Sequence, residues 1–263
     1  MTTKRRDITE QPSPAGAPRR ADPCEGPPEV SVVIPAFNEE GPIVACVREV
    51  DEAVKGVRRP YEIIVVDDGS TDRTFDLLKD LKKDVPALRV LRFAANCGQT
   101  AAFDAGFKAA RGQFVVALDA DQQNDPADIP RLLELAGEWD VVCGVRAKRR
   151  DSLVRRISSR IGNGTRNLLT GDNIRDVGCS LRAFRAECLR DLKLYKGLHR
   201  FLPTLLKWEG WSVTEVPVNH RPRQSGRSKY GVWNRMFRGL RDLFAVRWMK
   251  SRHICYEIRE EIP

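Results

Sequence analysis

The sequence lacks several features that would indicate particular classes of protein. No apolar stretch approaches the roughly 18 residues of a membrane-spanning helix, so we expect none. The N-terminal segment MTTKRRDITEQPSPAG has no apolar stretch behind its basic residues, which argues against a secretory signal. Neither a GxGxxG fingerprint nor a Walker phosphate loop is present. Bound phosphates would therefore have to be held by a metal ion or by basic side chains.

Cysteine and histidine give no sign of a disulfide scaffold, a zinc site or a catalytic imidazole. The seven cysteines are odd in number, irregularly spaced and contain no CxxC pair, at positions 24, 46, 97, 143, 179, 188 and 255. This pattern favours reduced cysteines in a cytoplasmic protein. The three histidines, at positions 199, 220 and 253, are interpreted as structural.

Positive charge is concentrated in two segments. Residues 221–252 contain ten Lys and Arg against one acidic residue, so they carry the whole formal net charge of +9. Residues 146–166 contain eight Lys and Arg against one Asp. Such patches indicate an anionic partner, which could be phosphate groups, an acidic membrane surface or nucleic acid.

Hydrophobic patterning predicts an α/β protein. Residues 1–29 contain six prolines and few large apolar residues, and we predict a disordered tail. Apolar runs of strand length then alternate with helical patterns. The strand-like runs cover 31–34 with its neighbours, 62–66, 88–92, 114–118 and 140–145, and the helical patterns lie around 40–56, 71–83, 99–110 and 126–137. Near-continuous β-branched runs are typical of a mostly parallel, doubly wound sheet covered by helices.

The second half continues this domain with a different rhythm. We expect helices at 151–170, 200–210 and 229–250 and a strand at 211–220, without an internal repeat or an independent second core. The predicted organisation is a tail at 1–29, one catalytic domain at 30–228, and a basic amphipathic helix with its tail at 229–263.

Acidic residues follow three of the predicted strands. The first strand leads into Asn38-Glu39-Glu40, the second into Asp67-Asp68-Gly69-Ser70, and the fourth into Asp119-Ala120-Asp121. Open α/β sheets bind ligands outside the carboxyl ends of their strands, so these clusters should meet at one edge. Asp119, Asp121 and Gln123 place two carboxylates and an amide oxygen at alternate positions, a pattern suited to Mg²⁺ or Mn²⁺.

Several motifs together resemble the inverting family 2 glycosyltransferases. The motifs are SVVIPAFNEE, VVDDGSTD, ALDADQQ, RDVGCSLRAFR, HRFLP, HRPRQSGRSKYG and LRDLFAVRWM, and the match covers roughly residues 30–250. Within that family the sequence is most similar to the polyprenyl-phosphate branch, which includes dolichol-phosphate mannosyltransferases and bacterial undecaprenyl-phosphate sugar transferases. The resemblance implies a GT-A type fold.

The resemblance also implies roles for individual residues. The nucleotide-sugar would be bound by Pro35, Phe37, Glu39, Val66, Asp68, Asp119 and Ala120. Asp119, Asp121 and Gln123 would hold the metal ion. Asp121 would act in catalysis together with four cations that contact the donor diphosphate or the acceptor phosphate, namely Arg146, Arg200, Arg223 and Lys229. Family members often carry Tyr where this chain has Phe37, so a hydroxyl contact is lost.

The implied reaction moves a sugar from GDP-mannose or a UDP-sugar to dolichyl or undecaprenyl phosphate. A lipid phosphate is already anionic at neutral pH, so it needs no strong general base. Catalysis would consist of positioning the substrates and neutralising the departing nucleoside diphosphate with the metal and the arginines. In-line displacement would invert the anomeric configuration.

The C-terminal segment carries a second expectation. Apolar residues at 233, 236, 237, 240, 243, 244 and 248 follow a helical stripe beside four arginines. Such a helix either lies in an anionic membrane surface or packs on the core. Peripheral attachment at the cytoplasmic face could use this helix, a separate membrane-anchor subunit or a homo-oligomer.

Four other interpretations compete with this one. A sugar nucleotidyltransferase is disfavoured because no glycine-rich basic signature is present near the start of the chain. A saccharide acceptor remains open, although the late GRSKYG segment favours a phosphate. A nucleic-acid-binding protein is disfavoured because the acidic clusters repel phosphate and no aromatic-basic RNA motif is present. A catalytically silent membrane scaffold is disfavoured by the intact Asp119, Asp121 and Gln123 set.

Overall fold

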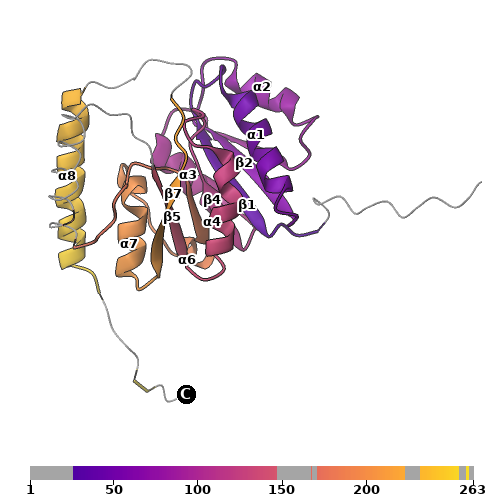
Figure 1. Cartoon of the computed structure of the whole chain (residues 1–263). Coiled ribbons are helices and arrows are strands. Elements are labelled where there is room, and N and C mark those ends of the chain that lie inside the picture. The colour runs from indigo at the N-terminus through magenta and orange to yellow at the C-terminus, as the bar shows by residue number, and fades with distance from the viewer. Residues whose placement is uncertain (1–25, 147–166, 168–170, 223–231, 255–258, 261–263) are drawn as a thin grey trace, which may run out of the picture.

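The described part of the chain is built on one mixed seven-stranded sheet with helices on both faces (Figure 1). The computed structural model describes residues 26–146, 167, 171–222, 232–254 and 259–260. The strand order is β3-β2-β1-β4-β6-β5-β7. The strands are β1 Val30–Ala36, β2 Tyr61–Asp67, β3 Leu88–Arg92, β4 Phe114–Ala117, β5 Val141–Arg146, β6 Arg182–Arg185 and β7 Val213–Val218.

Strand direction confirms the mostly parallel sheet expected from the sequence. The first four strands pair in parallel, and β5 pairs in parallel with β7. Strand β6 runs antiparallel to both β4 and β5 and so joins the two parallel groups. The sequence did not predict β6, because its four residues, Arg-Ala-Phe-Arg, give too short a pattern.

Helices connect the strands and cover the two faces of the sheet. Their bounds are α1 Ile43–Lys55, α2 Thr74–Leu81, α3 Gln99–Ala109, α4 Ile129–Leu135, α6 Glu187–Arg190, α7 Leu202–Trp208 and α8 Val232–Ser251, with 3₁₀ turns η1 Pro126–Asp128 and η2 Leu198–Phe201. The predicted helices at 40–56, 71–83, 99–110, 126–137 and 200–210 are confirmed with shorter bounds. Helix α8 covers residues 232–251 of the region where a helix was expected at 229–250, and residues 229–231 lie outside the described residues. The helix expected at 151–170, apart from Asn167, and most of the tail at 1–29 lie outside the described residues.

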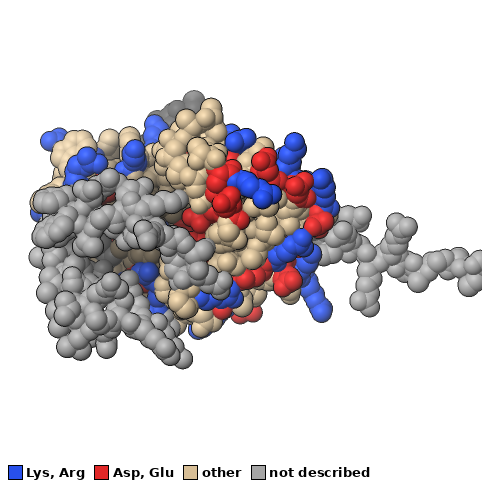
Figure 2. All heavy atoms as spheres, turned by 90° about the horizontal axis from the view of Figure 1, so that it is seen from above, with Lys and Arg blue, Asp and Glu red and all other residues tan. Residues whose placement is uncertain are grey.

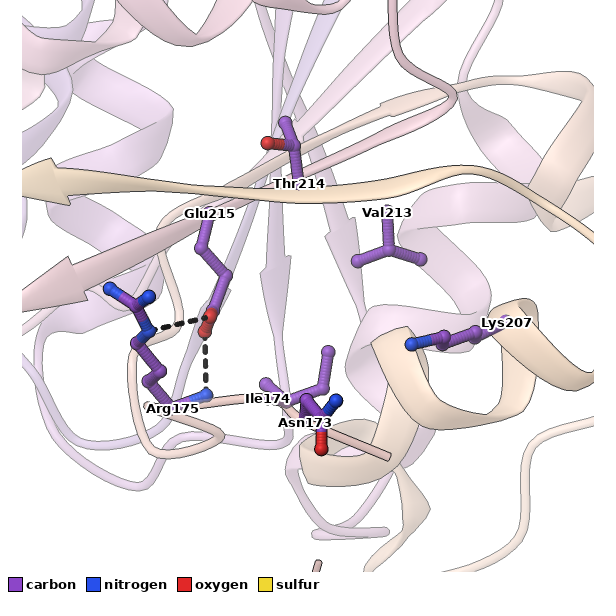
Figure 3. Close-up of a pocket in the computed structure, with 7 residues that line it drawn as sticks. All are labelled: Asn173, Ile174, Arg175, Lys207, Val213, Thr214 and Glu215. Carbon is purple, nitrogen blue, oxygen red and sulfur yellow. Dashed lines mark hydrogen bonds and ion pairs between the residues drawn. The ribbon is translucent and has the colours of Figure 1, made fainter. Parts of the chain in front are cut away.

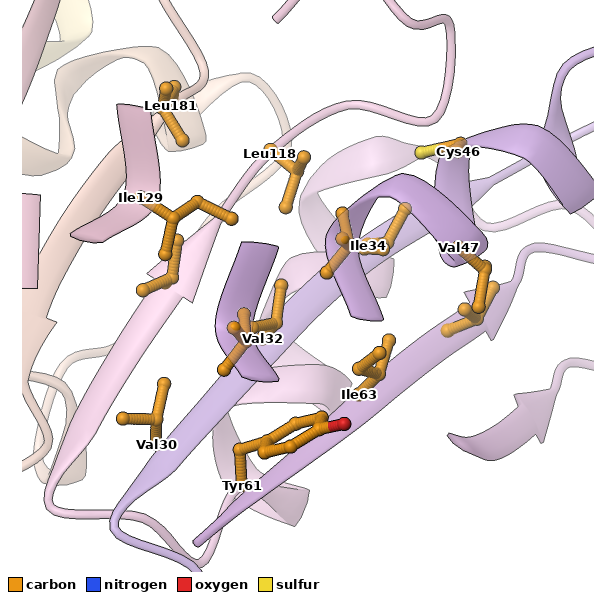
Figure 4. Packing of buried hydrophobic residues seen from close by; sticks show 14 of the residues in the cluster. Val30, Val32, Ile34, Cys46, Val47, Tyr61, Ile63, Leu118, Ile129 and Leu181 are labelled. Atoms are coloured by element: carbon orange, nitrogen blue, oxygen red, sulfur yellow. The ribbon is translucent and has the colours of Figure 1, made fainter. Parts of the chain in front are cut away.

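Successive side chains of the central strands point to opposite faces of the sheet, so the core has two layers. Val32 and Ile34 of β1 face one layer with residues of α1, α2 and α4, whereas Val33 faces the other layer with residues of α3, α6 and α7. Figure 4 shows the first layer, where side chains of α1 lie over β1 and β2. Because both faces are buried, the central strands consist mainly of apolar residues. Helix α3 approaches β1 closely at Gly106, where a Cβ would lie 2.2 Å from Val33 Cγ1.

The last helix, α8, lies beside α7 (Figure 1). Leu243 and Val246 of α8 are buried against Leu198, Phe201 and Leu205. Phe244 and Trp248 are 63% and 64% exposed. Among the described residues, no helix is both long and apolar enough to cross a membrane.

Candidate active site

The loops that follow β1, β2 and β4 meet at one edge of the sheet, as the parallel strand directions require. Figure 2 views the molecule from above, and acidic side chains gather on this face with Lys and Arg among them. Hydrogen bonds tie the first two loops together. Asn38 N donates to Ser70 Oγ at 3.0 Å, and Thr71 N donates to Asn38 Oδ1 at 2.8 Å. Glu39 N donates to Thr74 Oγ1 at 2.9 Å.

Asp119 follows the buried end of β4 and is surrounded by polar neighbours. Its Oδ1 accepts a hydrogen bond from Gln99 Nε2 at 2.7 Å. Burial raises the pKa of Asp119 to about 6, and the nearby charge of Asp121 acts in the same direction. A hydrogen bond from Ser180 and the charge of Arg182 oppose the increase. Two neighbouring carboxylates, one of them poorly solvated, are an environment that a divalent cation would stabilise.

The loop after Asp121 is fixed by a positive-φ turn and by a distant segment. Gln122 has φ of 57°, and Gln123 N donates to Asp121 Oδ1 at 3.2 Å. Arg221 N donates to the Gln123 carbonyl at 2.9 Å. The Arg221 guanidinium also pairs with Glu49 and, at 2.8 Å, with Asp125. The start of the late basic segment therefore lies directly against the predicted metal ligand Gln123.

The available metal ligands suit a hard cation that is also coordinated by oxygens of the substrate. Among the described residues, no group of three or more His, Cys, Asp or Glu side chains forms a metal site. The chain offers two carboxylates, on Asp119 and Asp121, and the amide oxygen of Gln123. Mg²⁺ is commonly held by one or two carboxylates together with waters and substrate phosphates, so these residues fit such an ion.

The predicted nucleotide-binding residues differ in what they expose. Phe37 and Glu39 are half-buried at the edge of the sheet and can face a ligand. Val66 and Ala120 are buried in the hydrophobic core, at 0% and 3% exposure, and Pro35 is buried in β1. The side chains of Val66 and Ala120 therefore contribute shape beneath the site, and a ligand contact there would have to come from the backbone.

Asp68 is engaged in holding a neighbouring loop. Its carboxylate accepts hydrogen bonds from Asn96 Nδ2 at 2.9 Å, Cys97 N at 2.7 Å and Gly98 N at 2.9 Å. Gly69, with φ of 70°, presses against the same loop, because a Cβ there would lie 2.6 Å from the Ala95 carbonyl carbon. Asp68 thus positions the loop that leads into α3.

The predicted phosphate-binding cations are in three different situations. Arg146 forms a two-point ion pair with Asp176, with Nε and Nη2 each 2.7 Å from a carboxylate oxygen. Arg200 is exposed on η2. Arg223 and Lys229, and also Arg227, lie outside the described residues. The pairing of Arg146 orients its guanidinium through Asp176 and uses part of its hydrogen-bonding capacity.

Sequence reasoning missed the residues that support Asp119 from other elements. Gln99 lies on α3, Ser180 precedes β6, and Arg182 lies on β6. The Arg182 guanidinium is buried and donates to the carbonyls of Val177 and His199 at 2.7 and 2.9 Å. Asp176, Ser180 and Arg182 all belong to the motif RDVGCSLRAFR, so that motif carried a signal that could have found them. Gln99 had none.

His199 has the structural role that was expected of it. Its Nδ1 lies 2.7 Å from Thr100 Oγ1. Burial lowers the pKa of His199 to about 3, and the charges of Arg200 and Arg182 act in the same direction. The imidazole is therefore neutral at physiological pH and links η2 to α3.

A separate hollow of about 280 Å³ lies beside β7, away from the acidic edge (Figure 3). It is lined by Asn173, Ile174, Arg175, Lys207, Val213, Thr214 and Glu215. None of the predicted site residues lines it. Glu215 accepts a hydrogen bond from Arg175 N at 2.8 Å, so the side chain of Glu215 serves mainly to hold the 173–176 loop.

Comparison with solved structures identifies the fold. A mannosyltransferase from Pyrobaculum calidifontis in complex with GDP-Man and Mn²⁺ aligns with a TM-score of 0.62 and 20% identity, covering 93% of this chain and 70% of that one. Glucosyl-3-phosphoglycerate synthase from Mycobacterium tuberculosis in complex with Mn²⁺, UDP and phosphoglyceric acid aligns with a TM-score of 0.64 and 20% identity, covering 85% and 78%. The fold is GT-A, shared with these glycosyltransferases.

Sequence comparison then places the chain in a family. The profile of glycosyl transferase family 2 matches residues 31–193, and the chain belongs to this family. It is 40% identical over 224 residues to a dodecaprenyl-phosphate galacturonate synthase from Rhizobium johnstonii, covering 83% of this chain and 66% of that protein. It is 39% identical over 206 residues to an undecaprenyl-phosphate 4-deoxy-4-formamido-L-arabinose transferase from Edwardsiella ictaluri, covering 77% and 63%. The chain thus spans just under two thirds of the length of these relatives.

Proposed function

We propose that this protein transfers a sugar from a nucleotide-sugar to a polyprenyl phosphate with the help of Mg²⁺ or Mn²⁺. The observation that supports the proposal is that Asp119, Asp121 and Gln123 follow β4 at the edge of the sheet of a family 2 protein, where Arg221 N donates to the Gln123 carbonyl. The names of relatives at about 40% identity, which are synthases or transferases of polyprenyl-phosphate sugars, support the acceptor class.

Each part of the site would have a distinct task. A divalent cation held by Asp119, Asp121 and Gln123 would supply positive charge to the diphosphate of the donor. Phe37 would stack on the base, and Glu39 would accept hydrogen bonds from the nucleoside. The exposed Arg200 and the segment that begins at Arg221 would bind phosphate oxygens.

The acceptor phosphate would act as the nucleophile without a dedicated base. Its oxygen would form a bond to the anomeric carbon as the bond from that carbon to the donor diphosphate breaks. The electron pair would leave with the nucleoside diphosphate, whose added charge the arginines would help to neutralise. Neutral, buried His199 takes no part in this step.

A donor screen tests the proposal. Purified protein would be incubated with a short-chain polyprenyl phosphate, Mg²⁺ or Mn²⁺, and GDP-mannose or one of several UDP-sugars, and the glycolipid would be detected by mass spectrometry. We expect one donor to give a polyprenyl-phosphate sugar. Failure of every donor with active relatives as positive controls would contradict the proposal.

Attachment to an anionic membrane is part of the same proposal. The outer face of α8 carries the exposed Phe244 and Trp248 together with exposed Arg241, opposite the face buried through Val246, and exposed Arg252 follows the helix. Exposed aromatic side chains beside arginines suit the interfacial region of an anionic bilayer. This location would be peripheral at the cytoplasmic face, near the lipid acceptor.

A further inference from the structure

The turn before η2 holds a lysine in a defined place beside the site. Leu198 N donates to the Tyr195 carbonyl at 2.9 Å, and this bond encloses Lys196 and Gly197 in a four-residue turn. Gly197 has φ of 94° and ψ of −19°, as the third residue of a type II turn requires. A Cβ on Gly197 would lie 2.6 Å from Asp242 Oδ2, so the turn lies directly against α8.

The other side of this turn rests on α3. Gly197 N donates to the hydroxyl of buried Thr100 at 2.9 Å, and the same hydroxyl lies 2.7 Å from His199 Nδ1. The backbone next to Lys196 is therefore fixed between α3 and α8.

The side chain of Lys196 lies against Gly98, in the loop that leads to the predicted metal site. The Cε atom of Lys196 lies 4.0 Å from the position that a Cβ on Gly98 would take. Gly98 is followed by Gln99, whose side chain donates to Asp119 at 2.7 Å. Lys196 thus lies along the loop that Asp68 holds in place, one residue away from a contact to Asp119.

Within the described residues, Lys196 takes part in no ion pair, whereas the other cations around the site are mostly paired. Arg146 is paired with Asp176, and Arg221 with Glu49 and Asp125. An exposed ammonium on a fixed backbone, next to an acidic site that would receive phosphates, is suited to bind an anionic group of a substrate.

We infer that Lys196 binds a phosphate group of a substrate at the Gly98 side of the site, an inference that rests on the proposed transferase function. The phosphate could belong to the polyprenyl phosphate or to the nucleotide-sugar. The first source is favoured because the turn adjoins α8, whose outer face would meet the lipid, whereas the donor diphosphate would be held at Asp119 and Asp121.

Kinetics of Lys196→Ala and Lys196→Arg test this inference, with Lys193→Ala as the matched control, because Lys193 is an exposed lysine in the same loop. Loss of a charge-assisted hydrogen bond should raise the KM of one phosphate substrate about tenfold in Lys196→Ala. Lys196→Arg should keep a KM close to that of wild type, and Lys193→Ala should behave as wild type. All variants should keep the wild-type melting temperature.

Two measurements identify the source of the phosphate. If it belongs to the acceptor, the KM for polyprenyl phosphate rises and the affinity for nucleoside diphosphate with Mn²⁺, measured by calorimetry, is unchanged. If it belongs to the donor, that affinity falls. Lys196→Ala with both quantities at wild-type values would overturn the inference, and this result is distinct from an inactive wild-type protein, which would contradict the proposed function instead.

Discussion

At the scale of single residues, the predicted metal ligands Asp119 and Asp121 have different surroundings. Asp119 is held by Gln99 and Ser180 and is poorly solvated, and its pKa is raised to about 6. Asp121 lies in the following loop, where its carboxylate accepts a hydrogen bond from Gln123 N. We choose Asp121 to test the metal site, because replacement of Asp119 would also break its hydrogen bonds with Gln99 and Ser180.

We expect Asp121→Asn to lose metal binding and transfer activity together. Removal of one of two carboxylates from a site that has few protein ligands should lower the affinity for the metal ion about tenfold or more. Mn²⁺ binding can be measured by calorimetry in the presence of nucleoside diphosphate, and turnover by glycolipid formation. Asp80→Asn, which changes an exposed residue of α2, is the control. Normal turnover of Asp121→Asn would show that Asp121 is not a metal ligand.

His199 should make the stability of the protein depend on pH. The unfolded chain takes up a proton near pH 6.5, whereas folded His199 stays neutral down to about pH 3. Stability should therefore be unaffected by this group above pH 7 and should decrease as the pH falls below 6.5. The expected loss between pH 6.5 and pH 5 is about 2 kcal/mol.

Denaturant titrations at several pH values check this expectation. His199→Asn should be less stable than wild type at pH 7 but should lack the decrease between pH 6.5 and pH 5. His253→Asn changes an exposed histidine and should keep the decrease. Equal pH dependence in wild type and His199→Asn would show that His199 does not carry it.

At the scale of elements, α8 has two faces with different neighbours. The sequence pattern placed residues 243, 244 and 248 on one apolar stripe. The structure corrects this, because Leu243 is buried with Val246 while Phe244 and Trp248 are exposed. The helix therefore packs on the domain and still presents aromatic side chains outward, so the two interpretations of the sequence do not exclude each other.

Substitutions on the two faces should have opposite consequences. The double substitution Phe244→Ser with Trp248→Ser should leave thermal stability near wild type. It should reduce binding to anionic liposomes at least tenfold, because two apolar side chains that would be buried in the bilayer are lost. Leu243→Ala should instead destabilise the protein by about 2 kcal/mol or more. Sedimentation with liposomes of defined composition and thermal melting distinguish these effects.

Trp139→Ser is the control for the liposome experiment, because Trp139 is 38% exposed and belongs to another part of the surface, after α4. Binding should decrease with salt but not vanish, since the charged part is screened and the apolar part is not. If intact protein ignores anionic liposomes at low salt, α8 does not bind membranes.

Elements with continuous apolar runs could be predicted from the sequence, and the others could not. Strands β1, β2 and β5 are buried on both faces, and residues 32–36, 63–66 and 141–143 in them are all apolar. Strand β6 has Arg182 and Arg185 at its ends, and it is stabilised as a strand by pairing with β4 and β5. No local pattern contains that information, because the stabilising contacts come from distant strands.

At the scale of the whole molecule, topology explains both the success and the limits of the predicted site. Residues that directly follow parallel strands could be placed together, as Asp119 and Asp68 were. Their functions depend on partners that the sequence does not bring near them. Asp68 holds the 96–98 loop, and Arg146 is paired with Asp176. Only the folded chain shows these pairings.

A single competition assay can test metal-dependent transfer to a lipid phosphate. Wild-type protein would receive its donor with equal amounts of polyprenyl phosphate, the corresponding polyprenol and a saccharide acceptor, with Mn²⁺ or with EDTA. We expect sugar on the polyprenyl phosphate alone, and no transfer in EDTA. Transfer to the saccharide or the polyprenol, or undiminished transfer in EDTA, would contradict it.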